Sequence, residues 1–217
     1  MKRSVMMIKL LGRIPKEVCI AVSGGADSMA ALDFLSRNRK IKVLHYNHNT
    51  KYGDLAERVV VEYCEENGID YKVGRLLGEI PKGASKEDFW RRKRYEFFNK
   101  ECDGLSVVTC HHLDDAVETW IFTSLHGQSR LIPHKRDQFI RPFLTTRKES
   151  LLSWCENKSV PFADDPSNLD TRYMRNYIRH ILLPKALDVN PGLHKVVLKK
   201  LKQSYIKECK NVRKEAV

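Results

Sequence analysis

The sequence predicts an α/β protein built on a parallel sheet. Two observations support this fold class. Short apolar runs alternate with longer amphipathic stretches, and the chain of 217 residues is long enough to bury a sizeable core. Such an alternation gives a Rossmann-like sheet with right-handed crossover connections. Later helical patterns that follow without a comparable set of strands predict a helical C-terminal extension.

Four strands and four helices are expected in the first part of the chain. The strands are predicted at residues 17–22, 41–46, 69–76 and 105–109. The helices are predicted near residues 28–38, 54–67, 85–101 and 112–126. In a strand order 3-2-1-4-5, the order reverses between the first and fourth strands, and ligands bind outside the carboxyl ends of strands at such a point. The loops at 23–27 and 110–115 should therefore face one crevice.

The pattern changes after Arg130. Residues 130–144 are typical of a loop and a short strand. Residues 146–159 predict a helix, with Thr146 as a possible cap. Asp165 precedes a proline, which disfavours helix at that point. The remainder is therefore expected to be mainly helical.

The C-terminal end is predicted to be helical and basic. A helix is expected from Tyr173 to Leu187, then a break at Asn190-Pro191-Gly192 and a last helix to the end. Residues 171–217 hold twelve Lys and Arg against three Asp and Glu, which is +9 of the net charge of +12. This charge favours an anionic partner such as nucleic acid, although a solvated Lys-rich helix explains it as well. We divide the chain into a sheet domain at residues 1–140 and a basic helical extension at residues 141–217.

The composition argues against a membrane protein and against a disulfide-bonded one. No apolar run reaches 18 residues, so no membrane span is expected. The stretch MKRSVMMIKLLGR is basic and apolar, but Lys9 divides its apolar patch, which favours a lead-in helix over a signal peptide. The six cysteines form no CxxC pair. We therefore expect reduced thiols, a cytoplasmic location, and neither a structural zinc nor an iron–sulfur cluster.

The stretch SGGADS, residues 23–28, is the first candidate site. A turn that follows a strand and opens a helix directs backbone N–H groups at one point, where the helix dipole adds positive potential. Gly24 and Gly25 let the backbone approach an anion, and Ser23 and Ser28 offer hydroxyl donors. Asp27 could hold a magnesium ion that binds phosphate. A plain helix-capping turn is the alternative.

This stretch resembles the pyrophosphate loop of the N-type ATP pyrophosphatases, which have an adenine nucleotide alpha hydrolase-like fold. The resemblance implies that ATP is cleaved to AMP and pyrophosphate, with adenylation of a carbonyl oxygen. Mg²⁺ at Asp27 would be expected to assist this cleavage. The residues that would hold ATP are Ser23, Gly24, Gly25, Ala26, Asp27 and Ser28.

The stretch TCHHLDDAVETWIF, residues 109–122, is the second candidate site. Asp115 and Glu118 are three residues apart and share a helix face, where they could position magnesium or an amine. Acids in a first helical turn also suit the helix dipole, which is the plainer explanation. His111 and His112 point opposite ways at a strand end, so joint metal ligation is not expected.

Five stretches resemble those of the tRNA(Ile)-lysidine synthetases. They are HYNHNTK at 45–51, WRRKRYEFF at 90–98, HHLDDAVET at 111–119, FIRPFL at 139–144 and DPSNLDTRYMRNYIRHILLP at 165–184. The last stretch is the most specific. The resemblance implies ATP-dependent ligation of L-lysine to C2 of the wobble cytidine in tRNA(Ile) with a CAU anticodon. Lysidine would form through an adenylated cytidine, with release of pyrophosphate and AMP.

The resemblance also implies roles for individual residues. Asp115 and Glu118 would orient lysine or assist its deprotonation, because an ammonium with a pKa of about 10.4 must lose a proton to attack. The arginines that would offset negative charge in the transition state are Arg91, Arg175 and Arg179. By spacing, Arg172 shares a helix face with two of these, and a solvated basic face is the alternative.

Other functions stay open. Ala116 stands where that family usually has Gln, and many members continue into further tRNA-contacting domains, for which the basic last helix would stand in. A non-catalytic tRNA-binding relative is therefore one alternative. Cys110 lies beside the expected site, so a tRNA thiolase of the same group is another, although those enzymes generally use a cysteine pair or a CxxC.

Overall fold

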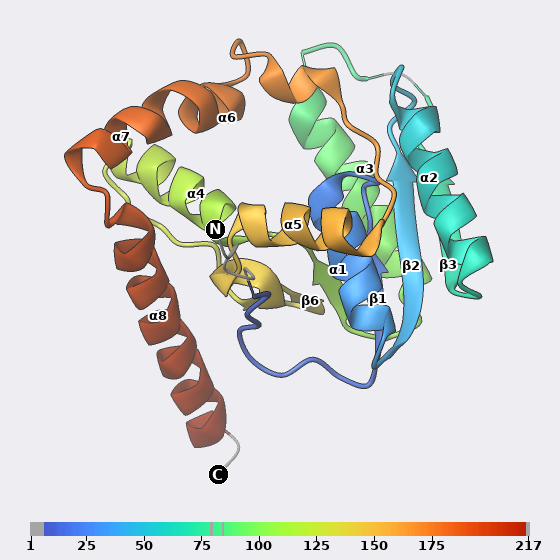
Figure 1. The fold of residues 1–217 in the computed structure, drawn as a ribbon, viewed down its shortest axis with the longest axis horizontal. Coiled ribbons are helices and arrows are strands. Elements are labelled where there is room, and N and C mark those ends of the chain that lie inside the picture. The colour runs from blue at the N-terminus through green and yellow to red at the C-terminus, as the bar shows by residue number, and fades with distance from the viewer. Residues whose placement is uncertain (1–6, 79, 84, 216–217) are drawn as a thin grey trace.

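The computed structural model describes residues 7–78, 80–83 and 85–215, and it shows a six-stranded sheet flanked by helices (Figure 1). The strand order is β3-β2-β1-β4-β6-β5. The strands are β1 Glu17–Ala21, β2 Lys40–Asn47, β3 Asp70–Arg75, β4 Val107–Thr109, β5 Lys135–Arg136 and β6 Phe139–Ile140. Neighbouring strands are parallel except for β5 and β6, which pair antiparallel at one edge. The α/β fold and the order of the first four strands are confirmed.

The central strand β1 buries side chains on both faces of the sheet. Successive side chains of a strand point to opposite sides. Val18 and Ile20 therefore join one apolar cluster, whereas Cys19 joins another with Phe98 of the helix α3 (Lys86–Glu101). A parallel sheet needs cover on both faces, and both clusters supply it.

Four helices cover the sheet. The helices of the first apolar cluster are α1 (Ala26–Ser36), α2 (Gly53–Glu66) and α5 (Lys148–Lys158). Helix α3 (Lys86–Glu101) packs on the opposite face. Helices α1 and α5 lie side by side (Figure 1). Over the described residues, none of the helices is both long and apolar enough to cross a bilayer.

The remaining helices form a third apolar cluster around α4 (Leu113–Leu125). They are a 3₁₀ turn at Pro142–Thr145, a π-helical turn at Ile178–Leu182, α7 (Leu183–Val189) and α8 (Leu193–Glu215). A second 3₁₀ turn at Pro166–Leu169 and the short α6 (Met174–Tyr177) precede the π-helical turn and have no buried residue. Leu193, Val197 and Leu201 of α8 are buried in this cluster. Segments from both sides of residue 140 thus share apolar clusters, and the division into two domains stays a prediction.

Two local predictions are wrong. Residues 7–13 form no helix, because this segment bonds to the body of the protein rather than to itself: the Leu11 N–H donates to the Pro142 carbonyl at 2.7 Å. Residues 1–6 of the predicted lead-in helix lie outside the described residues. Thr146 does not cap α5. Its hydroxyl donates to the Lys9 carbonyl at 2.7 Å, and Arg147 is the N-cap residue.

Candidate functional site

The glycine loop, residues 23–28, connects β1 to α1 at the carboxyl edge of the sheet. Gly24 has a φ of +88°, and a Cβ there would lie 2.9 Å from the backbone oxygen of Ala56. Glycine is therefore required at this position on two independent grounds, conformation and space. Gly25 is the N-cap residue of α1, so the N–H groups of Ala26 and Asp27 at the start of this helix have no partner within it.

Ser28 holds the glycine loop in shape. Its buried hydroxyl donates to the Gly25 carbonyl at 2.9 Å and accepts from the Ser23 N–H at 3.1 Å. The Ser28 proton is therefore used within the loop. The exposed Ser23 hydroxyl lies 3.1 Å from the Ser28 hydroxyl and remains accessible to a ligand.

The start of α4 meets the glycine loop through His112. His112 caps α4 in a reciprocal pair: its Nδ1 accepts from the Asp115 N–H, and the Asp115 carboxylate accepts from the His112 N–H. The His112 Nε2 lies 3.4 Å from the Asp27 carboxylate. Burial opposes protonation, but the Asp115, Asp27 and Asp114 carboxylates outweigh it and raise the pKa of His112. One side chain thus joins the two candidate stretches.

Asp27 keeps one oxygen free. Its Oδ2 faces His112 and lies 4.0 Å from the Lys148 ammonium, whereas its buried Oδ1 has no hydrogen-bond partner among the described residues. Burial acts against ionisation, but His112 and Lys148 outweigh it, so the pKa of Asp27 falls below its usual value. Mg²⁺ is commonly held by one or two carboxylates together with substrate phosphates. The donor set fits that use, although the described residues contain no group of three metal-ligating side chains.

Arg179 holds the two carboxylates of α4. Its Nε donates to Glu118 at 2.6 Å, and its Nη2 donates to the other Glu118 oxygen at 3.0 Å and to Asp115 at 3.3 Å. Glu118 is only 4 % exposed, and burial raises its pKa despite the arginine. This pair connects the π-helical turn at Ile178–Leu182 to α4.

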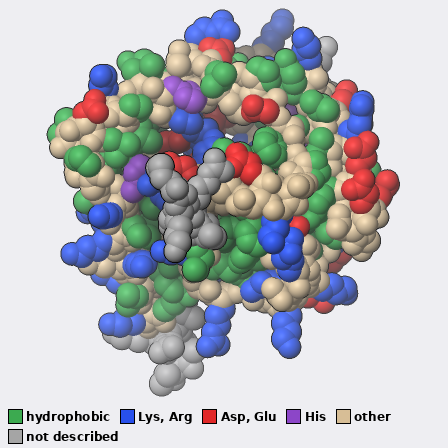
Figure 2. All heavy atoms as spheres, in the orientation of Figure 1, with side chains coloured by type: hydrophobic (Ala, Val, Ile, Leu, Met, Phe, Trp, Pro, Cys, Tyr) green, Lys and Arg blue, Asp and Glu red, His purple; other side chains and the backbone are tan. Residues whose placement is uncertain are grey.

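A cavity of about 500 Å³ lies between these elements, over the carboxyl ends of β1, β2 and β4. Figure 2 shows that this face of the molecule is hollowed in its upper half, where charged side chains of both signs gather. The residues predicted for the site that line the cavity are Ser23, Gly25, Asp27, Ser28, Asp115 and Arg175. Glu118 and Arg179 lie behind Asp115 and are not part of the lining.

The other predicted arginines lie elsewhere. Arg91 lines a second cavity, between α3 and the β5–β6 hairpin. Arg172 precedes α6 rather than lying on it, and it forms a bidentate ion pair with Asp170, with Nη2 at 2.7 Å. The single helix face predicted for three arginines is therefore wrong for Arg172.

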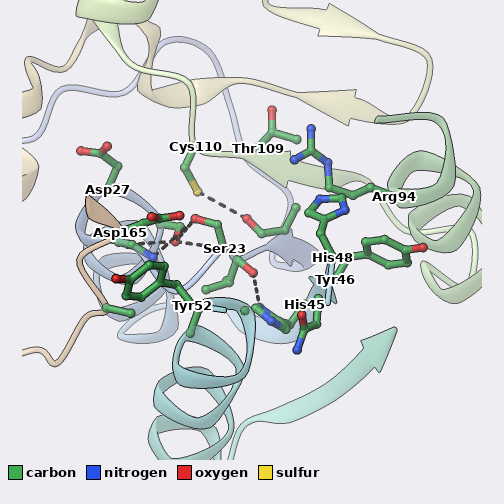
Figure 3. A pocket seen from close by; sticks show the side chains of 18 of the residues that line it. Ser23, Asp27, His45, Tyr46, His48, Tyr52, Arg94, Thr109, Cys110 and Asp165 are labelled. Carbon is green, nitrogen blue, oxygen red and sulfur yellow. Dashed lines mark hydrogen bonds between the residues drawn. The ribbon is translucent and has the colours of Figure 1, made fainter. Parts of the chain in front are cut away.

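One wall of the cavity consists of aromatic and basic side chains to which sequence reasoning gave no role (Figure 3). His48 stacks on Trp90 with ring centroids 4.9 Å apart, and Lys86 lies over the same indole at 4.4 Å. The His48 Nδ1 and the Trp90 Nε1 are buried without a partner among the described residues. Burial, with Arg94 nearby, lowers the pKa of His48 to about 4, so this ring is neutral at pH 7. His48 and Trp90 belong to the HYNHNTK and WRRKRYEFF stretches, which the sequence had already marked. That these two side chains meet depends on how α3 packs on the sheet, which the sequence does not show.

Residues of the C-terminal half close the opposite side of the cavity. The Ala163 N–H donates to the Gly24 carbonyl at 2.8 Å, which ties this segment to the glycine loop. Asp164, Asp165 and Asn168 line the cavity beside it. The DPSN stretch thus reaches the site from far along the chain.

Cys110 lines the cavity, but its environment disfavours a reactive thiolate. Its thiol lies 3.7 Å from the Ala21 carbonyl (Figure 3). Burial, reinforced by Asp27 and Asp115, raises its pKa well above the ordinary value of a thiol. A thiolate nucleophile needs the opposite environment.

Comparison with known proteins assigns the chain to a family. Residues 4–186 match the PP-loop domain. A tRNA(Ile)-lysidine synthase of Staphylococcus aureus (strain COL) is 33% identical over 209 residues, which cover 88% of this chain and 48% of that protein. A protein of the same name from Thermotoga sp. (strain RQ2) is 30% identical over 200 residues, covering 84% and 48%. The chain spans about half the length of the curated relatives it matches.

Solved structures give a weaker likeness. An NH3-dependent NAD synthetase from Campylobacter jejuni, in complex with the nitrate ion, has a TM-score of 0.47 and 13% sequence identity. The match covers 90% of this chain and 88% of that one. The family assignment rests on the sequence matches alone.

Proposed function

The chain belongs to the PP-loop domain family, and from that premise we propose that it uses ATP to ligate L-lysine to the wobble cytidine of tRNA(Ile) with a CAU anticodon. The names of its relatives support the reaction class. The observation that carries the proposal is the contact between Asp27 and His112, 3.4 Å apart. It holds the glycine loop and the acidic start of α4 at one cavity, so a phosphate site and a carboxylate site can act on the same substrate.

In the first step the cytidine O2 attacks the α-phosphate of ATP. The bond between the α- and β-phosphates breaks, pyrophosphate leaves, and an adenylated cytidine remains. The glycine loop and the N-terminus of α1 would hold the departing pyrophosphate. A magnesium ion, when bound, would neutralise phosphate charge, and the free Oδ1 of Asp27 is the atom we propose for its ligation.

In the second step a lysine amine attacks C2 of the cytidine. The C2–O bond breaks and AMP leaves, so adenylation has turned a poor leaving group into a good one. Asp115 lines the cavity and would orient the ammonium and receive its proton. Glu118 has both oxygens held by Arg179, so we propose that it positions Arg179 and Asp115 rather than touching lysine.

Two arginines would act on the negative charge that develops on the phosphates. Arg175 lines the cavity and has no ion-pair partner among the described residues, so it is available to an anion. Arg179 is held behind Asp115 and would act at longer range. Preorganised cations of this kind stabilise a transition state without reorganisation at the moment of reaction. Because tRNA and ATP meet in the cytoplasm, we place the protein there.

The test supplies labelled lysine, ATP and a tRNA(Ile) transcript with a CAU anticodon to the purified protein. We expect acid-precipitable label and one AMP for each lysine incorporated. Asp27→Asn should lower the rate by about 10²-fold or more, as loss of one preorganised charge typically does. Glu156→Gln, at an exposed position of α5, is the matched control and should leave the rate unchanged.

Each other outcome excludes a part of the proposal. Formation of ADP would exclude adenylation. Formation of AMP without label in the RNA would exclude lysine as the second substrate. Binding of tRNA that is unaffected by Asp27→Asn, without any AMP, would identify a non-catalytic tRNA-binding protein.

A further inference from the structure

A second cavity, of about 410 Å³, lies between α3 and the β5–β6 hairpin. We call it the hairpin groove. Its lining residues are Asp88, Arg91, Arg92, Tyr95, Asn99, Arg136, Asp137, Gln138, Phe139 and Arg141. Of the residues predicted for the site, Arg91 is the one that lines it, and the proposed function above gives the groove no role. Four arginines against two aspartates give the groove a formal charge of +2.

The arginines of the hairpin groove lack close counter-ions. Arg92 lies 3.8 Å from Glu96, and Arg136 lies 3.9 Å from Asp137. For Arg91 and Arg141 no carboxylate lies within ion-pair distance among the described residues. Pairs as long and exposed as the first two contribute little to stability. The groove therefore keeps most of its positive charge available.

Arg141 is the one buried arginine among the four that line the hairpin groove. Only 4 % of it is exposed, and its Nη1 donates to the Pro133 carbonyl at 3.0 Å. A buried charge is costly unless it is paired. Burial lowers the pKa of Arg141, the neighbouring Tyr95 acts against this by raising it, and the nearby Arg91 and Arg136 lower it further. An anion in the groove would supply the negatively charged partner that Arg141 lacks among the described residues.

The hairpin groove and the main cavity adjoin at Tyr95. Tyr95 lines both, and the guanidinium of Arg91 stacks over its ring at 5.1 Å. On the other side of Tyr95, Arg94 lines the main cavity without an ion-pair partner among the described residues. Its pKa is lowered by burial and by the neighbouring Arg91 and Arg175. A row of cations therefore runs from the main cavity to the β5–β6 edge.

We propose that the hairpin groove binds the phosphodiester backbone of the RNA strand next to the nucleotide whose base enters the main cavity. This inference rests on the proposed function, because it takes RNA as the substrate. A row of separate arginines suits a chain of phosphates better than one small anion, on which donors would converge. The exposed amides of Asn99 and Gln138, bonded to each other at 2.5 Å, add donors and acceptors for ribose hydroxyls.

The experiment measures binding of a fluorescent anticodon stem-loop RNA to the full chain over a range of salt concentrations. The test variant is Arg92→Gln/Arg136→Gln, which changes two exposed side chains outside the proposed catalytic set. We expect about tenfold weaker binding near 0.1 M salt and a salt slope less steep by about 1.4, at about 0.7 for each lost phosphate contact. ATP binding, measured separately, should not change. The matched control is Arg58→Gln/Lys72→Gln, which removes two exposed cations on α2 and β3, away from the β5–β6 edge.

Different results would overturn the groove assignment and the proposed function. If the wild-type protein forms lysidine but the Arg92→Gln/Arg136→Gln variant binds RNA with the wild-type affinity and slope, the groove assignment is overturned and the proposed function stands. If ATP affinity falls while RNA affinity does not, the groove serves the nucleotide and the assignment is also overturned. If the wild-type protein binds no RNA, both are overturned.

Discussion

Gly24 is a position in the candidate site where a residue with a Cβ does not fit. We expect Gly24→Ala to lower the free energy of unfolding by about 1–3 kcal/mol, because φ is positive and the new Cβ would press on the Ala56 backbone. ATP affinity should fall as well. Gly68→Ala is the control, since φ is +62° there but nothing lies within 4 Å of the new Cβ. It should cost about 1 kcal/mol and spare ATP binding. Calorimetry of unfolding and of ATP binding would measure both, and equal effects of the two changes would contradict the steric argument.

His48 gives the site a predicted pH dependence. Its pKa is lowered from 6.5 to about 4 in the folded protein, so between these values the unfolded chain binds a proton that the native ring does not. Stability should therefore fall as the pH falls from about 6.5 to about 4. His48→Phe keeps the aromatic stack on Trp90 and should flatten this fall in Tm. His126→Phe, at an exposed position, should not. An unchanged pH profile in His48→Phe would exclude the neutral ring as the cause.

Cys110 separates the proposed ligase from a thiolase. Because its thiol is buried, with a raised pKa, Cys110→Ser should retain lysine transfer within about threefold of the wild-type rate. A thiolase that used this residue would lose all activity. The rate of RNA labelling in the lysine assay decides between them.

At the scale of elements, the ion pair between Arg179 and Glu118 joins the π-helical turn to α4. Glu118→Ala would leave a largely buried guanidinium without its main partner, so we expect a loss of about 3–5 kcal/mol in the free energy of unfolding. Replacing both residues by Met should recover much of that loss, because apolar side chains of similar volume can substitute for a buried pair. Lysine transfer should be absent in the double variant, because both Glu118 and Arg179 are then missing from the site. Denaturant unfolding measures the first two effects, and recovery of activity in the double variant would mean that the pair serves folding alone.

The sequence predicts the elements that have a clear local pattern, but not those whose structure is set by tertiary contacts. Strands β1 to β4 and helices α1 to α4 follow local patterns, so their ends could be predicted to within two residues. The segment at residues 7–13 has a helical composition, yet it bonds to the turn at Pro142–Thr145, and such tertiary contacts leave no local signal. The Thr146 hydroxyl is diverted to Lys9 for the same reason.

On the scale of the whole molecule, the site is assembled from segments that are far apart in the sequence. The glycine loop and the start of α4 could be brought together in advance, because parallel strands place their carboxyl ends at one edge. The aromatic wall of His48 and Trp90 could not, because it depends on the orientation of α3 against β2. The burial of Arg141 likewise depends on the β5–β6 hairpin, which is only two residues long in each strand.

Helix α8 has a buried apolar face and an exposed basic face, and we expect mutations on the two faces to have different effects. Leu193, Val197 and Leu201 are buried against the α4 cluster, so a chain shortened to residue 189 should expose that cluster and aggregate. On the exposed face, Lys195→Gln/Lys199→Gln/Lys202→Gln should leave Tm within about 2 °C, because surface substitutions of this kind have small effects.

The same triple Lys variant decides between the two explanations of the basic C-terminal end. If the helix contacts tRNA backbone, the affinity for full-length tRNA should fall by about tenfold or more, with a salt slope less steep by about 2 to 3, at about 0.7 to 0.9 for each lost contact. The anticodon stem-loop should lose less if the lysines reach other parts of the tRNA. A solvated helix with no partner predicts unchanged binding of both RNAs. Fluorescence anisotropy with the two RNAs side by side therefore tests whether the charge of this helix serves recognition or only solubility.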